Sequence, residues 1–432
     1  MDQSPKTKLN ALTSLRFVAA AMIVFQHSYY NFAKYVPFKG LQKTQAVSFF
    51  FVLSGFILSY VYPNLNSFAD VRRFLVARFA RIWPAHIFAL ILVLVLIPRE
   101  LWIAATGSST HPVLKSLANI CMVHAWFPDR GYCYAFNSPS WSISTEFFFY
   151  LCFPVLIYKW KDSWKIKLLA AAVLTLSVIL LARALGLTDV PSKHGISIET
   201  LLYVNPLPRL LEFTLGMTVF LAWEKLRLIN IGRVVATFLE LLAVGAALAG
   251  SYWVTKEAHS ADAMKWMGMA GKGWFLHSGS LVFFAFLILI IALEKGLVSK
   301  TLSLPFAVVL GEISFSVYLI HLVLLGFYRA HADAFSTVPD WLAYIFFWVL
   351  LLVTAHLVWR IIELSARRYL VDQLAPARAQ MAGNTNLHQK RHARKTGHTS
   401  AVEPSFRKQW LVMELLLLGG LVTTIALNYN PR

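Results

Sequence analysis

Two ionisable side chains share one face of the first apolar stretch, Leu12 to Phe32. Arg16 and His27 are eleven positions apart, which in a helix leaves them about 20° apart around the axis and about 16 Å apart along it. Ionisable groups inside a membrane span are costly and usually face a protein interior. The pair suits a site with a fixed cation at one depth and a proton-accepting nitrogen at another. A snorkelling arginine and a buried, hydrogen-bonded histidine are the structural alternative.

A second pair of cations opens the third apolar stretch, in the segment ARFARIWPAH. Arg78 and Arg81 are three positions apart, so both lie on one face of a helix. We expect them at the same depth as Arg16, on the inner side of the membrane. Guanidinium groups bind phosphate and carboxylate groups through paired hydrogen bonds. The three arginines are therefore a candidate binding site for a phosphate or carboxylate group, although a single arginine here would be an ordinary basic flank.

An acidic residue lies in the fourth stretch, PSWSISTEFFFY. Its position predicts that Glu146 is about one turn inside the outer surface, where a carboxylate is costly unless it is paired. The first helix brings His27 to the same level, so we expect Glu146 to pair with His27 and orient it as a general base. A structural ion pair or a hydrogen bond to a tyrosine is the alternative. Trp141 and Ser142, which open the stretch, are candidates for substrate binding.

Other ionisable residues allow more than one interpretation. Arg209 and Glu212 are three apart at the outer end of the sixth stretch, a spacing that favours a structural pair within one helix. His321, in the outer half of the ninth stretch, is either a substrate-binding residue or a core histidine satisfied by a neighbour. His356 and Glu363 share a face of the tenth stretch, and we assign them no role.

The elements that must position these residues are apolar. Of 432 residues, 58 % are hydrophobic and 14 % are charged, whereas soluble domains carry about 25 % charged residues. The fold class is therefore all-α, a polytopic membrane helical bundle. Stretches of roughly 20 apolar residues predict ten core transmembrane helices and one additional C-terminal helix, at 11–32, 46–62, 74–97, 141–159, 166–186, 208–224, 233–254, 276–295, 305–328, 340–363 and 409–428.

The loops differ in charge between the two sides. The excess of Lys and Arg falls on the side of the N-terminus throughout, so we expect that end in the cytoplasm of a multi-pass protein of the cell (inner) membrane. With an odd number of spans, the C-terminus would lie outside. The net charge of +19 fits basic cytoplasmic loops better than nucleic-acid binding, because no soluble domain is expected to make such a contact.

Three segments divide the chain. Residues 1–370 form the membrane-embedded domain, within which 113–127 is either loop or a re-entrant or interfacial piece. Residues 371–408 are polar, basic and histidine-rich, which predicts a disordered cytoplasmic linker, with contact to anionic lipid headgroups as the weaker alternative. Residues 409–432 hold the additional helix.

Cysteine usage is sparse. Cys121 and Cys133 are both expected outside, where they form a disulfide in an oxidising compartment or stay free thiols. Neither the cysteines nor the histidines have a spacing that predicts a metal site.

The ordered set of motifs over roughly residues 9–370 resembles the acyltransferase-3 family of integral-membrane O-acyltransferases. Two features depart from the resemblance: Glu363 is followed by Leu364 and Ser365 rather than by a proline two residues on, and the linker and last helix lie outside the shared region. The segments that carry the resemblance are LRFVAAAMIVFQH, FFFVLSGFILS, FLVARFARIWPAH, WSISTEFFFY, RLLEFTLGM and FSVYLIHLVLL.

The resemblance implies a function and assigns roles. In that family the first-helix histidine is thought to act in acyl transfer and the inner arginines to engage coenzyme A. Those roles fall on His27 for transfer and on Arg16, Arg78 and Arg81 for the donor, while Glu146 matches the family's acidic residue. The expected reaction moves an acyl group from cytoplasmic acyl-CoA, with acetyl-CoA favoured, to a hydroxyl of a cell-surface or exported glycan or a lipid-linked saccharide.

A transporter or exporter of a lipid-linked or small anionic substrate is the alternative, because buried Arg, His and Glu also suit a proton-coupled pathway. The hydropathy shows no internal repeat, which tells mildly against a transporter. The oligomeric state stays open.

Overall fold

The computed structural model describes residues 8–98, 111–189 and 195–374, and in these ranges the chain is helical and without strands. The principal helices are α1 (Asn10–Phe32), α2 (Ala46–Val61), α3 (Phe68–Leu96), α5 (Pro112–Ile120), α6 (Arg130–Cys133), α7 (Trp141–Ile157), α8 (Trp160–Ala184), α9 (Pro206–Leu226), α10 (Arg233–Ala258), α11 (Ala261–Ser278), α12 (Leu281–Ile291), α13 (Leu297–Leu302), α14 (Pro305–Ala330), α15 (Asp340–Val358) and α16 (Leu364–Leu374).

Shorter helical turns connect or extend these helices. They are η1 (Lys43–Gln45), η2 (His124–Trp126), η3 (Ser138–Ser140), η4 (Glu199–Val204), η5 (Ala332–Phe335) and η6 (Trp359–Glu363).

The bundle confirms the predicted fold class. Nine helical segments in the described ranges are long and apolar enough to cross a membrane. The predicted sixth span corresponds to α9, which is not among the nine and which packs against α2 and α8. The predicted C-terminal helix and all of the predicted linker beyond Leu374 lie outside the described residues.

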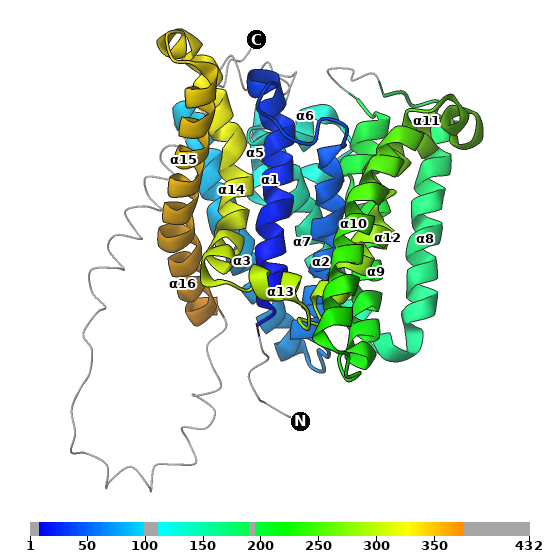
Figure 1. The fold of residues 1–432 in the computed structure, drawn as a ribbon. Helices are drawn as coiled ribbons and strands as arrows, with labels where there is room; N and C mark the ends of the chain where they lie inside the picture. The colour runs from blue at the N-terminus through cyan, green and yellow to red at the C-terminus, as the bar shows by residue number, and fades with distance from the viewer. Residues whose placement is uncertain (1–7, 99–110, 190–194, 375–432) are drawn as a thin grey trace, which may run out of the picture.

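The long helices run alternately up and down between two ends of the bundle (Figure 1). We call the end where α1 begins at Asn10 the Asn10 face, and the opposite end, where α1 stops at Phe32, the Phe32 face. Helices α1 and α14 both run from the Asn10 face to the Phe32 face, and α16 ends at the Asn10 face. The two outer ends of the described chain therefore lie on the same side of the bundle.

Helix α1, which carries Arg16 and His27, is fixed at its start by a residue from another part of the chain. Its N-cap, Leu9, has no side chain that can accept a hydrogen bond. The Glu294 carboxylate accepts one from the backbone N–H of Ala11 at 3.0 Å instead. This bond satisfies one of the unpaired N–H groups that every helix start leaves, and a carboxylate is favoured there by the helix dipole.

Glycine allows α1 and α14 to approach closely. A Cβ atom added at Gly311 would lie 2.1 Å from the carbonyl oxygen of Thr13. Likewise, a Cβ atom at Gly216 of α9 would lie 1.9 Å from the carbonyl oxygen of Val52 in α2. Small residues commonly permit such backbone contact between membrane helices. At Gly311 this contact brings together the two helices that carry His27 and His321.

The segment 111–140 folds into the bundle rather than over it. The indole of Trp83 donates to the carbonyl of Ile120 at 3.0 Å, and the Asn137 side chain donates to the carbonyl of Leu319 at 3.0 Å. Leu319 lies near the middle of α14. Most of 113–127 is helical, in α5 and η2, so the alternative of a re-entrant or interfacial piece describes this segment better than a loop. As a consequence α7, which follows this segment, begins in the interior.

We predict that Gly311→Ala destabilises the bundle by about 1–3 kcal/mol, because the new methyl group would overlap a backbone carbonyl that cannot rotate away. Thermal unfolding of the detergent-solubilised protein measures the effect. Gly245→Ala in α10 is the matched control, since a Cβ atom there has nothing within 4 Å. Equal melting temperatures for the two variants would contradict the prediction.

Candidate active site

A cavity of about 670 Å³ lies between α1, α2, α3, α7 and α14. Lys8 and Val61 line it at the Asn10 face and are well exposed, so the cavity reaches the surface there. Ser142 and Tyr318 line it in the interior. Most of the wall between is apolar. Three arginines and one carboxylate project into it: Arg16, Arg78, Arg81 and Glu146.

The three arginines gather as the sequence predicts. The guanidinium of Arg78 lies over the Tyr62 ring, 5.4 Å from its centroid, and donates to the Tyr62 hydroxyl at 3.3 Å. Its Nε is buried and has no hydrogen-bond partner among the described residues. A buried donor without a partner is costly, so this nitrogen is available to an oxygen atom of a ligand.

Arg81 and Arg16 have carboxylate neighbours. Nη1 of Arg81 lies 3.9 Å from Oε2 of Glu363, which is buried and also accepts from the Ser316 hydroxyl. Arg16 interacts electrostatically with both Glu146 and Glu363. Sequence reasoning left Glu363 without a role. The sequence places Glu363 at the same depth as Arg81, and this shared depth could have indicated that the two residues pair.

The cluster carries more positive than negative charge. Arg367 of α16 does not line the cavity but interacts electrostatically with Arg78 and Arg81. Four arginines thus face the carboxylates of Glu146 and Glu363. The excess of cations at the Asn10 side of the cavity favours an anionic ligand.

Glu146 does not pair with His27, contrary to the sequence prediction. Its carboxylate accepts from the Tyr150 hydroxyl at 2.6 Å and from the Ser54 hydroxyl at 3.3 Å. The error came from the depth of α7. Tyr318, in the middle of α14, donates to the carbonyl of Pro139 at 2.9 Å, so α7 begins well inside the bundle. A helix that starts there carries Glu146 towards the arginines.

His27 pairs instead with His321. Nδ1 of His27 and Nε2 of His321 are 2.7 Å apart, and the two ring planes are 11° apart with centroids separated by 5.0 Å. His321 is fully buried, whereas His27 is partly accessible. The sequence placed both histidines in the outer half of their helices, but it did not predict their contact.

The histidine pair and the arginine cavity are adjacent but separate. Neither His27 nor His321 lines the cavity, which ends at Ser142 and Tyr318. The hydroxyl groups of these two residues are 2.7 Å apart, and the Tyr318 ring lies 5.9 Å from the His321 ring. A cavity continuous from the arginines to His27, which the sequence-based hypothesis required, is therefore not present with Tyr318 in this position.

Of Ser142 and Trp141, the other two predicted substrate-binding residues, only one lines the cavity. Ser142 lies at the inner end of the cavity, whereas Trp141 does not line it. Trp141 is 4 % exposed, with the Tyr203 ring 4.6 Å from its own. The cysteines expected outside are free thiols, with Cys121 exposed and Cys133 buried.

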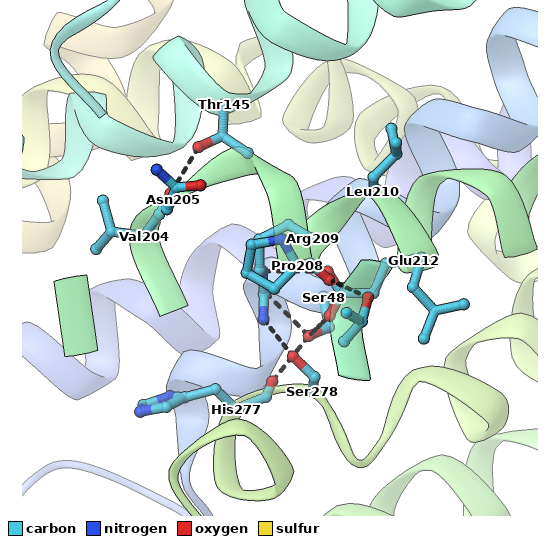
Figure 2. A network of polar contacts seen from close by, with 12 residues as sticks. Ser48, Thr145, Val204, Asn205, Pro208, Arg209, Leu210, Glu212, His277 and Ser278 are labelled. Carbon is cyan, nitrogen blue, oxygen red and sulfur yellow. Dashed lines mark hydrogen bonds and ion pairs between the residues drawn. The ribbon is translucent and has the colours of Figure 1, made fainter. Parts of the chain in front are cut away.

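A second polar network lies away from the cavity, around Arg209 and Glu212 (Figure 2). Nε of Arg209 is 3.1 Å from Oε2 of Glu212, which confirms the predicted pair within one helix. Ser48 donates to Glu212 at 2.7 Å and to the carbonyl of His277 at 2.8 Å, and Arg209 also donates to the Ser278 hydroxyl. The network joins α2, α9 and α11. Both ions are buried and paired, as a structural role requires.

Comparison with known proteins identifies the class. A family model described as an acyltransferase domain matches residues 9–360. The chain therefore belongs to the acyltransferase-3 family, and it is a multi-pass membrane protein. No solved structure matches it.

Three curated relatives share parts of the chain. Acyltransferase MdmB of Streptomyces mycarofaciens is 33 % identical over 41 % of this chain and 46 % of its own length. Nodulation protein 10 of Rhizobium leguminosarum bv. viciae is 26 % identical over 61 % of this chain and 74 % of its own. Putative peptidoglycan O-acetyltransferase YrhL of Bacillus subtilis is 28 % identical over 50 % of this chain and 34 % of its own. The match thus spans less than half of the first relative.

We predict that Glu212→Leu destabilises the protein by about 3–5 kcal/mol, because it leaves the Arg209 charge buried without its partner. The double variant Arg209→Met with Glu212→Leu should lose much less, since it removes both charges. Thermal unfolding in one detergent compares the two. A double variant less stable than the single one would show that the pair itself holds the helices together.

Proposed function

We propose that this enzyme transfers an acyl group, with acetyl favoured, from acyl-CoA to a hydroxyl of a cell-surface or exported glycan. The observation that carries the proposal is the cavity in which three arginines gather beside a surface opening. Coenzyme A is strongly anionic at its phosphates and slender along its pantetheine arm. Those two properties correspond to the cationic Asn10 side of the cavity and to its apolar interior.

The donor would bind with its phosphates near Arg78 and Arg81. Arg78 offers a buried Nε without a partner, and guanidinium groups suit phosphate oxygens. A volume of about 670 Å³ is within the usual range of ligand pockets, about 300–1,000 Å³. Since acyl-CoA is a cytoplasmic metabolite, this binding mode puts the Asn10 face in the cytoplasm, as the loop charges predict.

His27 would act as the general base. Its Nε2 takes the proton of the acceptor hydroxyl while the oxygen attacks the thioester carbonyl. The new C–O bond forms, the C–S bond breaks, and the proton passes to the leaving thiolate of coenzyme A. An acyl-histidine relay is the variant in which Nε2 itself first accepts the acyl group. In either case the acyl group must pass Ser142 and Tyr318, so a rotation of the Tyr318 side chain would have to join cavity and histidine.

The name of the Bacillus relative supports an acetyl group and a glycan acceptor for this chain. The general experiment is incubation of the purified protein with labelled acetyl-CoA and muropeptides. Recovery of label on the sugar supports the proposal. Passage of an unmodified substrate across a vesicle membrane, without transfer of label, would favour the transporter alternative.

We predict that His27→Ala lowers acyl transfer by at least 10²-fold, because base catalysis typically contributes 10²–10⁴-fold. The protein should still insert in the membrane, since His27 is only partly buried. Mass spectrometry of surface polysaccharide, in cells with and without the variant, measures O-acylation. His259→Ala, an exposed histidine at the end of α10, is the matched control. Undiminished acylation in His27→Ala cells would refute the role of His27.

We predict that Arg78→Ala and Arg81→Ala each raise the KM for acetyl-CoA about tenfold or more, since a hydrogen bond to a charged group contributes about 1.5–3 kcal/mol. Arg73→Ala is the control on the same helix, because Arg73 pairs with Asp70 and does not line the cavity. Initial rates at varied acetyl-CoA concentration provide the measurement. An equal rise in the control would mean that only the overall charge of this face matters.

A further inference from the structure

The contacts of His321 determine which of its ring nitrogens carries a proton. Nδ1 of His321 lies 2.5 Å from the backbone carbonyl oxygen of Tyr318. A carbonyl oxygen can only accept, so Nδ1 must donate a hydrogen. In a neutral imidazole the other nitrogen, Nε2, then has no hydrogen and accepts. The ring is fully buried, where a second proton would put an unpaired charge into an apolar interior.

The same reasoning extends to His27. Its Nδ1 is 2.7 Å from Nε2 of His321. Because that nitrogen is an acceptor, Nδ1 of His27 carries the hydrogen and donates it. The neutral His27 ring therefore has its lone pair on Nε2. No described residue makes a hydrogen bond to this Nε2, and the side chain is partly accessible.

The contacts of the two rings thus act in one direction. The carbonyl of Tyr318 sets the hydrogen of His321, and His321 sets the hydrogen of His27, which leaves Nε2 of a neutral His27 ring as an acceptor.

We infer that His321 is a positioning residue, which holds His27 in the tautomer and orientation needed for Nε2 to act on the acceptor hydroxyl. The inference rests on the proposed function of His27 and replaces the sequence-based expectation that His321 binds substrate. The arrangement consists of three groups joined by two hydrogen bonds. The carbonyl of Tyr318 accepts from His321, and His321 accepts from His27. The short contact between the two rings, whose planes are 11° apart, fixes the plane in which the lone pair points.

Two variants test this arrangement. His321→Leu keeps a side chain of similar bulk but removes the acceptor, so the His27 ring is free to rotate and to move its proton. His321→Gln restores an amide oxygen that can accept from Nδ1. Gel filtration of both variants in detergent monitors folding, and the Gln variant supplies an answer if the Leu variant is unstable.

The first readout needs no acceptor substrate. Diethyl pyrocarbonate acylates unprotonated imidazole nitrogens, and mass spectrometry locates the modified residue. We expect His27 to react several-fold more slowly in His321→Leu than in the wild type and at nearly the wild-type rate in His321→Gln. Exposed His259 serves as the internal reference. Equal His27 rates in the wild type and both variants would overturn the positioning role and leave the proposed function untouched.

The second readout separates positioning from binding. The substrates are acetyl-CoA and muropeptides. His321→Leu should lower kcat at least tenfold, within the range of base catalysis, and leave both KM values unchanged. His321→Gln should recover part of the rate. A higher acceptor KM with an unchanged kcat would assign His321 to substrate binding and overturn the inference. If His27→Ala is fully active, the proposed function fails, whereas the modification rates still report on the histidine pair.

Discussion

The cost of holding charge within hydrocarbon governs the arrangement of this bundle. A guanidinium or carboxylate that faced lipid would be strongly destabilising, so Arg16, Arg78 and Arg81 turn inward onto one cavity. Arg209 and Glu212 obey the same constraint in another way, because the two buried ions pair with each other. The charges of Arg209 and Glu212 balance, whereas the cavity holds more arginines than carboxylates, and an excess of cations favours an anionic ligand.

Close backbone contact at glycine fixes the position of α1 relative to α14, the two helices that carry the histidines of the site. The contact of Gly311 with Thr13 lies towards the Asn10 face, one turn from Arg16, and the parallel course of α1 and α14 carries the register on to the histidines. Glu294 fixes the start of α1 from the opposite direction. Arg16 and His27 are thus held by one rigid element whose end and flank are both anchored, so their separation is set by the helix rise rather than by a loop.

The sequence predicted what depends on helical periodicity and on depth within a single span. The gathering of Arg16 with Arg78 and Arg81 needed only the starting points of two helices. The predicted pairing of Glu146 with His27 was wrong because it depended on the depth of α7. That depth depends on how far the segment 111–140 enters the bundle, and composition does not encode that distance. The contact between His27 and His321 depends on which helices are neighbours. A single sequence without internal repeats leaves that choice open.

The position of Tyr318 joins the two halves of the site. Its hydroxyl group lies at the end of the cavity, where it makes hydrogen bonds to the Ser142 hydroxyl and to the carbonyl of Pro139. Its own backbone carbonyl accepts a hydrogen bond from Nδ1 of His321. A side-chain rotation would break the first set of bonds and leave the carbonyl in place, because the carbonyl belongs to the helix backbone. The fold therefore permits the passage between cavity and histidine to open without disturbing the tautomer of His27. Under the proposed mechanism, that separation of side chain from backbone would keep water from the thioester until the acyl group reaches His27.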